Sequence, residues 1–228
     1  MKKLIFFLLI VFIPFNSYAH LDHYKNIKKI EMEIFKDGKK IGFNDYFFFK
    51  DKQKFTVKNN TKFKVNILGL NVLTMESESE EVYFDNNLLS FRSETLQNNK
   101  KKYVYVNLSP DKNFYKIEGS SYKGKINLDT IIGSWWNHKV LSFNQHISPI
   151  SGSIKRYSIN FKDKQMLSLN GNKYEASHFK IISKEEASNK EKTNLDIWID
   201  NKTNLIIKVI YSKYGKWEYR LKIIEYLN

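Results

Sequence analysis

Cysteine is absent from this chain of 228 residues. Its absence excludes a lipobox for acylation, disulfide bonds and thiolate metal sites. Long apolar runs are also absent beyond the first residues, so no later segment is expected to span a membrane. The fold must therefore be held together by its core, and residues 20–228 are long enough to form one domain around such a core.

Arginine is scarce as well, although the formal net charge is +14. Only Arg92, Arg156 and Arg220 offer the planar fork that suits phosphates and base edges; every other basic residue is lysine or histidine. The lysines are spread along the chain and often alternate with apolar residues, which is typical of the wet side of half-buried strands. We therefore expect no nucleic-acid partner. Attraction to anionic lipid headgroups is the alternative to solvated strand faces.

No sequence motif indicates catalysis or a bound cofactor. The G-x-S-x-G pattern of a nucleophile elbow is missing. An acidic cluster at residues 76–81 could bind calcium, but its glutamates alternate, so most of them share one strand face. Lys62 and Lys64 on a neighbouring strand would pair with them there. We expect ion pairs at this cluster, no metal site, no cofactor and no enzyme activity.

The start of the chain has the pattern of a secretory signal peptide. Lys2 and Lys3 precede an apolar run at residues 4–13, and the small residues Ser17 and Ala19 follow. As a helix this run would span only about 15 Å, half the thickness of a bilayer core. We predict that a Sec-type signal peptide, residues 1–19, is cleaved after Ala19, which leaves a soluble, monomeric periplasmic protein. A retained anchor is the alternative.

Cleavage at that point would make His20 the first residue, with His23 three positions later. An α-amine and imidazole nitrogens suit copper. The amino-terminal copper motif, however, has histidine at the third position. A copper site that uses the N-terminus would therefore need His138, His146 or His178 brought close by folding. An exposed, frayed N-terminus is the favoured interpretation, and copper binding through His20 and His23 is an outside hypothesis.

Period-two alternation dominates the rest of the chain. Ile30, Met32 and Ile34 share one strand face, and the following Asp-Gly pair at 37–38 predicts a tight hairpin turn. The end of the chain alternates in the same way and predicts a three-stranded antiparallel meander. Altogether the pattern predicts a mainly β protein of about ten or more strands, arranged as a single large curled antiparallel sheet or open half-barrel.

One segment, residues 130–152, breaks the alternation. Trp136, Val140 and Phe143 lie at i, i+4 and i+7 spacing, which predicts a short helix near 134–145. No linker or repeat is apparent, so we expect one domain.

The order of these features resembles a family of uncharacterised exported proteins of Gram-negative bacteria. The likeness rests on "DGKKIG", "ESESEEVYF", "SFRSET", "SWWNHKVL" and "DIWID … KVIYSKYGKWEYRL". That family in turn resembles the half-barrel superfamily of the lipoprotein carriers LolA and LolB. The resemblance implies a curved sheet wrapped around the segment containing Trp135 and Trp136, and it implies no reaction. Without cysteine the chain cannot be an acylated acceptor of the LolB type.

Aromatic residues are the strongest hint of a binding surface. In "YFFF", residues 46–49, adjacent rings point to opposite faces of a strand, and both faces cannot be solvated cheaply. Core packing is one explanation and a ligand wall is the other. The candidate ligand-binding residues are Phe47, Phe49, Trp135, Trp136, Trp198 and Trp217.

These features favour two functions. The first is a binding or carrier module whose concave apolar face holds a hydrophobic, lipid-like envelope molecule, with lysines at the rim. The second is a structural or interaction protein that docks an envelope protein partner, its apolar face being filled by its own Trp135 and Trp136 segment.

Overall fold

The structure of this protein is a computed structural model that describes residues 20–184, 194–212 and 214–227. The predicted signal peptide lies outside the described residues and stays a prediction. Within the described ranges, no helix has the length and apolar character needed to cross a membrane.

Strands make up most of the described chain. Two 3₁₀ helices, η1 (His20–Tyr24) and η2 (His138–Leu141), accompany them. The strands are β1 (Ile27–Lys36), β2 (Lys39–Asp51), β3 (Lys54–Ile67), β4 (Leu70–Phe84), β5 (Asn87–Gln97), β6 (Lys100–Leu108), β7 (Tyr115–Gly119), β8 (Lys123–Ile126), β9 (Thr130–Ile132), β10 (Gln145–Ile147), β11 (Ile154–Leu169), β12 (Asn172–Ser183), β13 (Asn194–Asp200), β14 (Ile206–Ser212) and β15 (Lys216–Tyr226).

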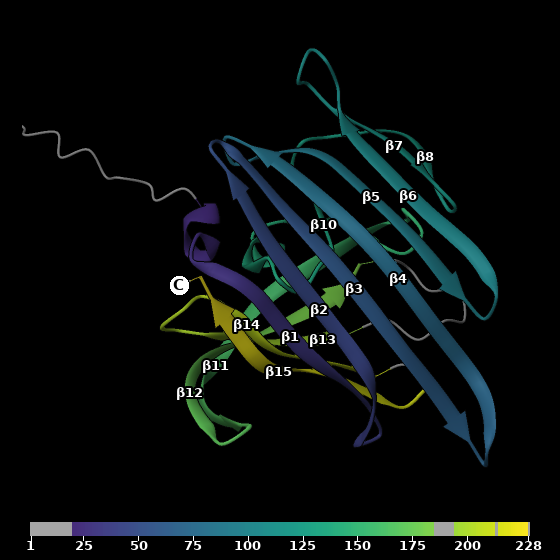
Figure 1. Ribbon diagram of the computed structural model, residues 1–228, viewed down its shortest axis with the longest axis vertical. Helices are drawn as coiled ribbons and strands as arrows, with labels where there is room; N and C mark the ends of the chain where they lie inside the picture. Colours follow the sequence, from purple (N-terminus) through teal and green to yellow (C-terminus); the bar gives the residue numbers. More distant parts are fainter. Residues whose placement is uncertain (1–19, 185–193, 213, 228) are drawn as a thin grey trace, which may run out of the picture.

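All of these strands join one 15-stranded sheet in the order β8-β7-β6-β5-β4-β3-β2-β1-β15-β14-β13-β12-β11-β10-β9. Neighbouring strands are antiparallel except β9 and β10, which are parallel. In Figure 1 the long strands β1 to β6 form one curved wall, and β11 to β14 lie behind it. The prediction of a mainly β protein with a single curled sheet is confirmed, and so is the C-terminal meander, which is β13, β14 and β15.

The sheet is nearly closed into a barrel, because its two ends meet. The amide of Ser121, in the β7–β8 turn, donates to the carbonyl of Ser151, in the β10–β11 loop, over 2.8 Å. Gly119 makes this approach possible, since a Cβ there would lie 2.9 Å from the same carbonyl oxygen. The curling therefore goes further than the predicted half-barrel.

The short helix predicted near 134–145 is confirmed in part, as the single 3₁₀ turn η2. The Asn137 side chain caps that turn by accepting from the Lys139 amide at 3.0 Å. Trp136 and Val140 are buried as the spacing predicted, but tertiary contacts hold the segment instead of successive helical hydrogen bonds. Within residues 130–152, the strands β9 and β10 were not predicted.

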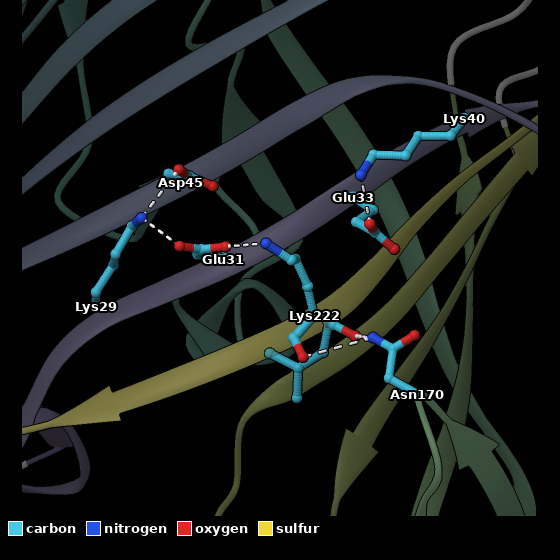
Figure 2. Close-up of polar contacts among 8 residues, drawn as sticks. Lys29, Glu31, Glu33, Lys40, Asp45, Asn170 and Lys222 are labelled. Carbon is cyan, nitrogen blue, oxygen red and sulfur yellow. Dashed lines mark hydrogen bonds and ion pairs between the residues drawn. The ribbon is translucent and has the colours of Figure 1, made fainter.

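The outer face of the sheet carries ion pairs, as expected for solvated strand faces. Figure 2 shows Lys29 between Glu31 and Asp45, with 3.3 Å to Asp45, while Lys222 of β15 reaches Glu31 at 2.8 Å. Lys222 and then Lys29 hydrogen bond to Glu31 and lower the pKa of its carboxyl. Asn170, in the β11–β12 turn, donates to the Leu221 carbonyl at 2.9 Å and ties that turn to β15.

A layered cavity as candidate functional site

A cavity of about 690 Å³ lies inside the barrel. It is lined by inward side chains of β2 to β5, by β14 and β15, and by the segment around Trp135. Ile67, Val72 and Tyr214 are both lining residues and solvent-exposed, so the cavity opens beside the β3–β4 and β14–β15 turns. We call this opening the mouth. Cavities of ~300–1,000 Å³ are the usual size for a small-molecule site.

The layer nearest the mouth is apolar. Val65 of β3 pairs with Leu73 of β4, and Phe63 pairs with Met75. The ring of Trp217 packs edge-on against Phe63, with 5.4 Å between ring centroids. Successive inward residues on each strand lie two positions apart, so the next residues inward form a distinct layer.

That next layer is polar on four consecutive strands. The register aligns Asn44 of β2, Thr61 of β3, Ser77 of β4 and Thr95 of β5. All four are buried. The Thr61 hydroxyl donates to Asn44 Oδ1 at 2.6 Å, and the hydroxyls of Ser77 and Thr95 lie 2.7 Å apart. Inward positions of a sheet are usually apolar, so this row departs from the rule of the fold.

One level deeper, the register aligns Tyr46, Asn59, Ser79 and Ser93. Ser93 is 2% exposed, lines the cavity, and its Oγ has no hydrogen-bond partner among the described residues. A buried hydroxyl without a partner costs free energy. We call the seven short side chains of these two rows the polar belt: Asn44, Asn59, Thr61, Ser77, Ser79, Ser93 and Thr95.

The floor of the cavity is formed by Glu81 and the segment that follows β9. Glu81 Oε1 accepts from Trp136 Nε1 at 2.8 Å and from the Ser134 hydroxyl at 3.0 Å. Its Oε2 accepts from the Tyr83 hydroxyl at 2.5 Å. Burial raises the pKa of the Glu81 carboxyl above its ordinary value of 4.5, and the bonds from Trp136, Tyr83 and Ser134 oppose that rise. The floor is therefore closed and acidic.

Among the described residues, positive charge reaches the cavity only near the mouth. The lysines that line the cavity there are Lys36, at the end of β1, and Lys155, at the start of β11. The lining histidine, His146, is buried, which lowers its pKa, and its Nε2 lies 2.9 Å from the Val140 carbonyl. Deep in the cavity a neutral hydrogen-bonding group would thus be accommodated better than an anion.

The sequence-predicted ligand residues divide into two groups. Trp135 and Trp217 line the cavity, and the Trp135 amide donates to the Tyr46 hydroxyl at 3.1 Å. Trp136 lies beneath the cavity, 1% exposed, where its ring packs edge-on against Tyr24 with 4.9 Å between centroids.

Phe47, Phe49 and Trp198 do not line this cavity, so their part in ligand binding stays a prediction. The inward frame of β2 is that of Tyr46 and Phe48, so Phe47 and Phe49 point outward, and Phe49 is 52% exposed. Phe47 borders a second depression of about 450 Å³ on the outer face. The Trp198 ring stacks on the His178 ring with 4.4 Å between centroids. Trp198 is adjacent to Ile197 in β13, so the two side chains point to opposite faces of the sheet.

The histidines form no metal centre within the described residues, where no group of three or more His, Asp or Glu could hold an ion. The rings of His23 and His138 lie 5.3 Å apart. Burial is the largest cause that lowers the pKa of His138, to about 4. The side chain of His20 lies outside what the structure describes, so copper binding stays a prediction.

The expected ion pairs of the acidic cluster are confirmed in part. Glu76 binds Lys62 at 2.7 Å, and Glu80 binds Arg92 at 3.0 Å. The polar belt and the inward role of Glu81 were not predicted from the sequence. A signal was present, since "FTVKNNTKF" places Asn59 and Thr61 in the same frame as Phe55, Val57 and Phe63.

A family model described as "Domain of unknown function (DUF6134)" matches residues 32–222. The prediction of a family of unknown function is confirmed, while a Gram-negative, exported origin stays a prediction. No curated protein matches the chain.

Among solved structures, the chain is similar to a beta-barrel-like protein of the DUF1849 family from Brucella abortus. The TM-score is 0.61 at 6% identity, over 89% of this chain and 98% of that one. Lower scores relate it to a protein with a YmcC-like fold from Bacteroides fragilis (TM-score 0.39, 10% identity, 86% of this chain and 94% of that one). A DUF1329 family protein from Desulfovibrio piger gives a TM-score of 0.28, at 8% identity over 90% and 88% of the two chains. The first likeness shows a barrel-like fold and no function.

Proposed function

Because this chain belongs to the DUF6134 family, a domain of unknown function, we propose a function from the layered cavity alone. The protein is a binding or carrier module that takes one lipid-like molecule into the barrel. The apolar part of this molecule lies against Phe63, Met75 and Trp217, and a neutral polar group such as an ester, amide or hydroxyl lies on the polar belt. With the predicted leader, the proposed compartment is the periplasm.

The observation that carries this proposal is the hydroxyl of Ser93, which has no hydrogen-bond partner among the described residues. It lies in a polar belt whose members Asn44, Thr61, Ser77, Ser93 and Thr95 are buried. A core needed only for stability would be filled with apolar residues at these positions. A ligand that offers a hydrogen-bond donor or acceptor at this depth would satisfy Ser93, and the acidic floor would disfavour a carboxylate there.

Tryptophan fluorescence offers a direct test, because Trp135 and Trp217 line the cavity and Trp198 does not. A monoacylglycerol brominated on its chain is expected to quench the protein, and Trp217→Phe is expected to remove much of the quenching. Trp198→Phe is the matched control and should leave that quenching in place. Native mass spectrometry of the purified full chain would also detect a retained lipid.

Two results would overturn the proposal. One is the absence of both quenching and a retained lipid. The other is quenching by a brominated fatty acid at a lower concentration than by the monoacylglycerol, because an anion would then be preferred beside Glu81. Ser77→Leu fills the belt and should weaken uptake, whereas Glu76→Leu, on the outer face of the same strand, should not.

A second candidate function is a structural or interaction protein of the envelope. Trp136 favours it, because this ring fills the lower part of the barrel as a plug. The plug ends at the floor, however, and the cavity remains above it. We therefore rank this function second.

A further inference from the structure

Most tight turns of this sheet begin with Asp or Asn, whereas the β3–β4 turn begins with Leu. Turns of this kind need positive φ, which Gly, Asn and Asp tolerate and bulky residues do not. The turns that begin with Asp or Asn have positive φ at both positions: Asp37–Gly38, Asp85–Asn86, Asn98–Asn99 and Asn170–Gly171. The β3–β4 turn is Leu68–Gly69, with Leu68 at φ 49° and 98% exposed.

A second turn at the mouth has the same peculiarity. Tyr214, between β14 and β15, has φ 51° and is 87% exposed. The remaining positive-φ residues other than Gly, Asn and Asp are Lys52 and Lys112, which are polar. Large apolar or aromatic residues thus occupy strained, exposed turn positions only at the mouth, within the described residues. Folding gains nothing from them there, which points to a contact made outside the protein.

Leu68 belongs to an apolar patch at the tip of the β3–β4 hairpin. Ile67, Leu70 and Val72 are all exposed, Leu70 by 71%. Ile67 and Val72 also line the cavity, so the patch is continuous with the mouth. Figure 1 shows this hairpin projecting past its neighbours at one end of the sheet.

The two ends of the sheet differ in their balance of charge. At the far end, Asp51, Asp85 and Asp111 lie in or next to the β2–β3, β4–β5 and β6–β7 connections, where they offset part of the positive charge of Lys50, Lys52, Lys54 and Lys112. At the mouth end, the β5–β6 turn leads into Lys100, Lys101 and Lys102, and the β1–β2 turn is flanked by Lys36, Lys39 and Lys40. The aspartate of that turn, Asp37, is bound to Lys36 and accepts from the Lys216 amide at 2.7 Å.

From these observations we propose that the mouth end docks on an anionic lipid surface. The apolar tip inserts among the acyl chains, Tyr214 lies at the headgroup level, and the lysines of the mouth turns contact the headgroups. Apolar burial combined with lysine attraction is the usual basis of reversible surface binding. This proposal does not depend on the ligand of the cavity. For the mouth lysines, it adopts the alternative left open by the sequence, which is attraction to anionic lipid headgroups.

Vesicle flotation of the full chain tests the proposal. Binding is expected to vesicles of equal parts phosphatidylcholine and phosphatidylglycerol, to weaken with added salt, and to be much weaker on pure phosphatidylcholine. Leu68→Asn should reduce partitioning by roughly tenfold or more, since it removes one inserted leucine. Because asparagine suits the φ of this turn, the melting temperature should hold or rise, which separates docking from folding. Phe84→Asn, an exposed apolar residue at the far end, is the control and should leave partitioning unchanged.

Lysine variants test the electrostatic part. Lys100→Gln with Lys101→Gln should weaken binding by roughly fivefold for each lysine removed, whereas Lys50→Gln with Lys54→Gln at the far end should have little effect. Absence of binding to both kinds of vesicle would overturn the proposal and would favour a protein partner for the tip. Equal loss from the mouth and far-end lysine pairs would overturn the assigned orientation.

Discussion

At the floor of the barrel, the inward side chain of Glu81 on β4 is enclosed by Trp136, Ser134 and Tyr83. At the mouth, the same strand begins with exposed Leu70 and Val72 beside the turn residue Leu68. At the floor, hydrogen bonds to a buried carboxylate hold the Trp136 ring in place. At the mouth, apolar side chains are exposed to water, and large residues occupy turn positions with positive φ. One strand thus connects a region built for stability with a region built for contact.

The largest expected effect is at the floor. Trp136→Ala should lower the free energy of unfolding by about 3–5 kcal/mol, because it removes a fully buried ring. It also removes the hydrogen bond to Glu81. Denaturant unfolding measures the loss. Trp135→Ala, at the half-buried cavity wall, should cost clearly less, and equal losses would contradict the distinction between plug and wall.

A smaller effect concerns pH. The folded-state pKa of Glu81 is raised by burial, so the folded protein binds this proton more tightly than the unfolded chain does. The resulting stability is fully present below the ordinary pKa of 4.5 and is lost as pH rises through the folded pKa. Glu81→Gln cannot titrate. The unfolding free energy of the unmodified protein minus that of Glu81→Gln should therefore fall between acid and neutral pH, as measured by urea unfolding; a constant or rising difference would refute the assignment.

The smallest effect lies in the polar belt, between the two regions. Thr61→Val should cost about 1–3 kcal/mol, because Asn44 loses a buried partner. Ser93→Ala should change stability by less than about 0.5 kcal/mol or stabilise the protein, since the Ser93 hydroxyl has no protein partner to lose among the described residues. Thermal unfolding compares the two. A large loss in Ser93→Ala would mean that this hydroxyl serves the fold, and the belt would cease to support ligand binding.

Much of the fold could be predicted because alternation is a local signal. Ile30, Met32 and Ile34 are buried as expected, and the Asp37–Gly38 turn lies where the sequence predicts it. The short helix predicted near 134–145 is present only as the 3₁₀ turn η2, because spacing cannot show that Trp136 finds a buried carboxylate on a distant strand. Which two rings of "YFFF" face inward could not be decided from the sequence, since the inward frame of β2 depends on pairing with neighbouring strands.

Local alternation was enough to establish that this chain forms strands with one apolar face and tight turns between them, because side-chain direction alternates with a period of two regardless of partners. Strand pairing was needed to show that Asn44, Thr61, Ser77 and Thr95 meet at one level inside a nearly closed barrel. Register and closure bring together residues far apart in the chain, and no local pattern encodes their depth.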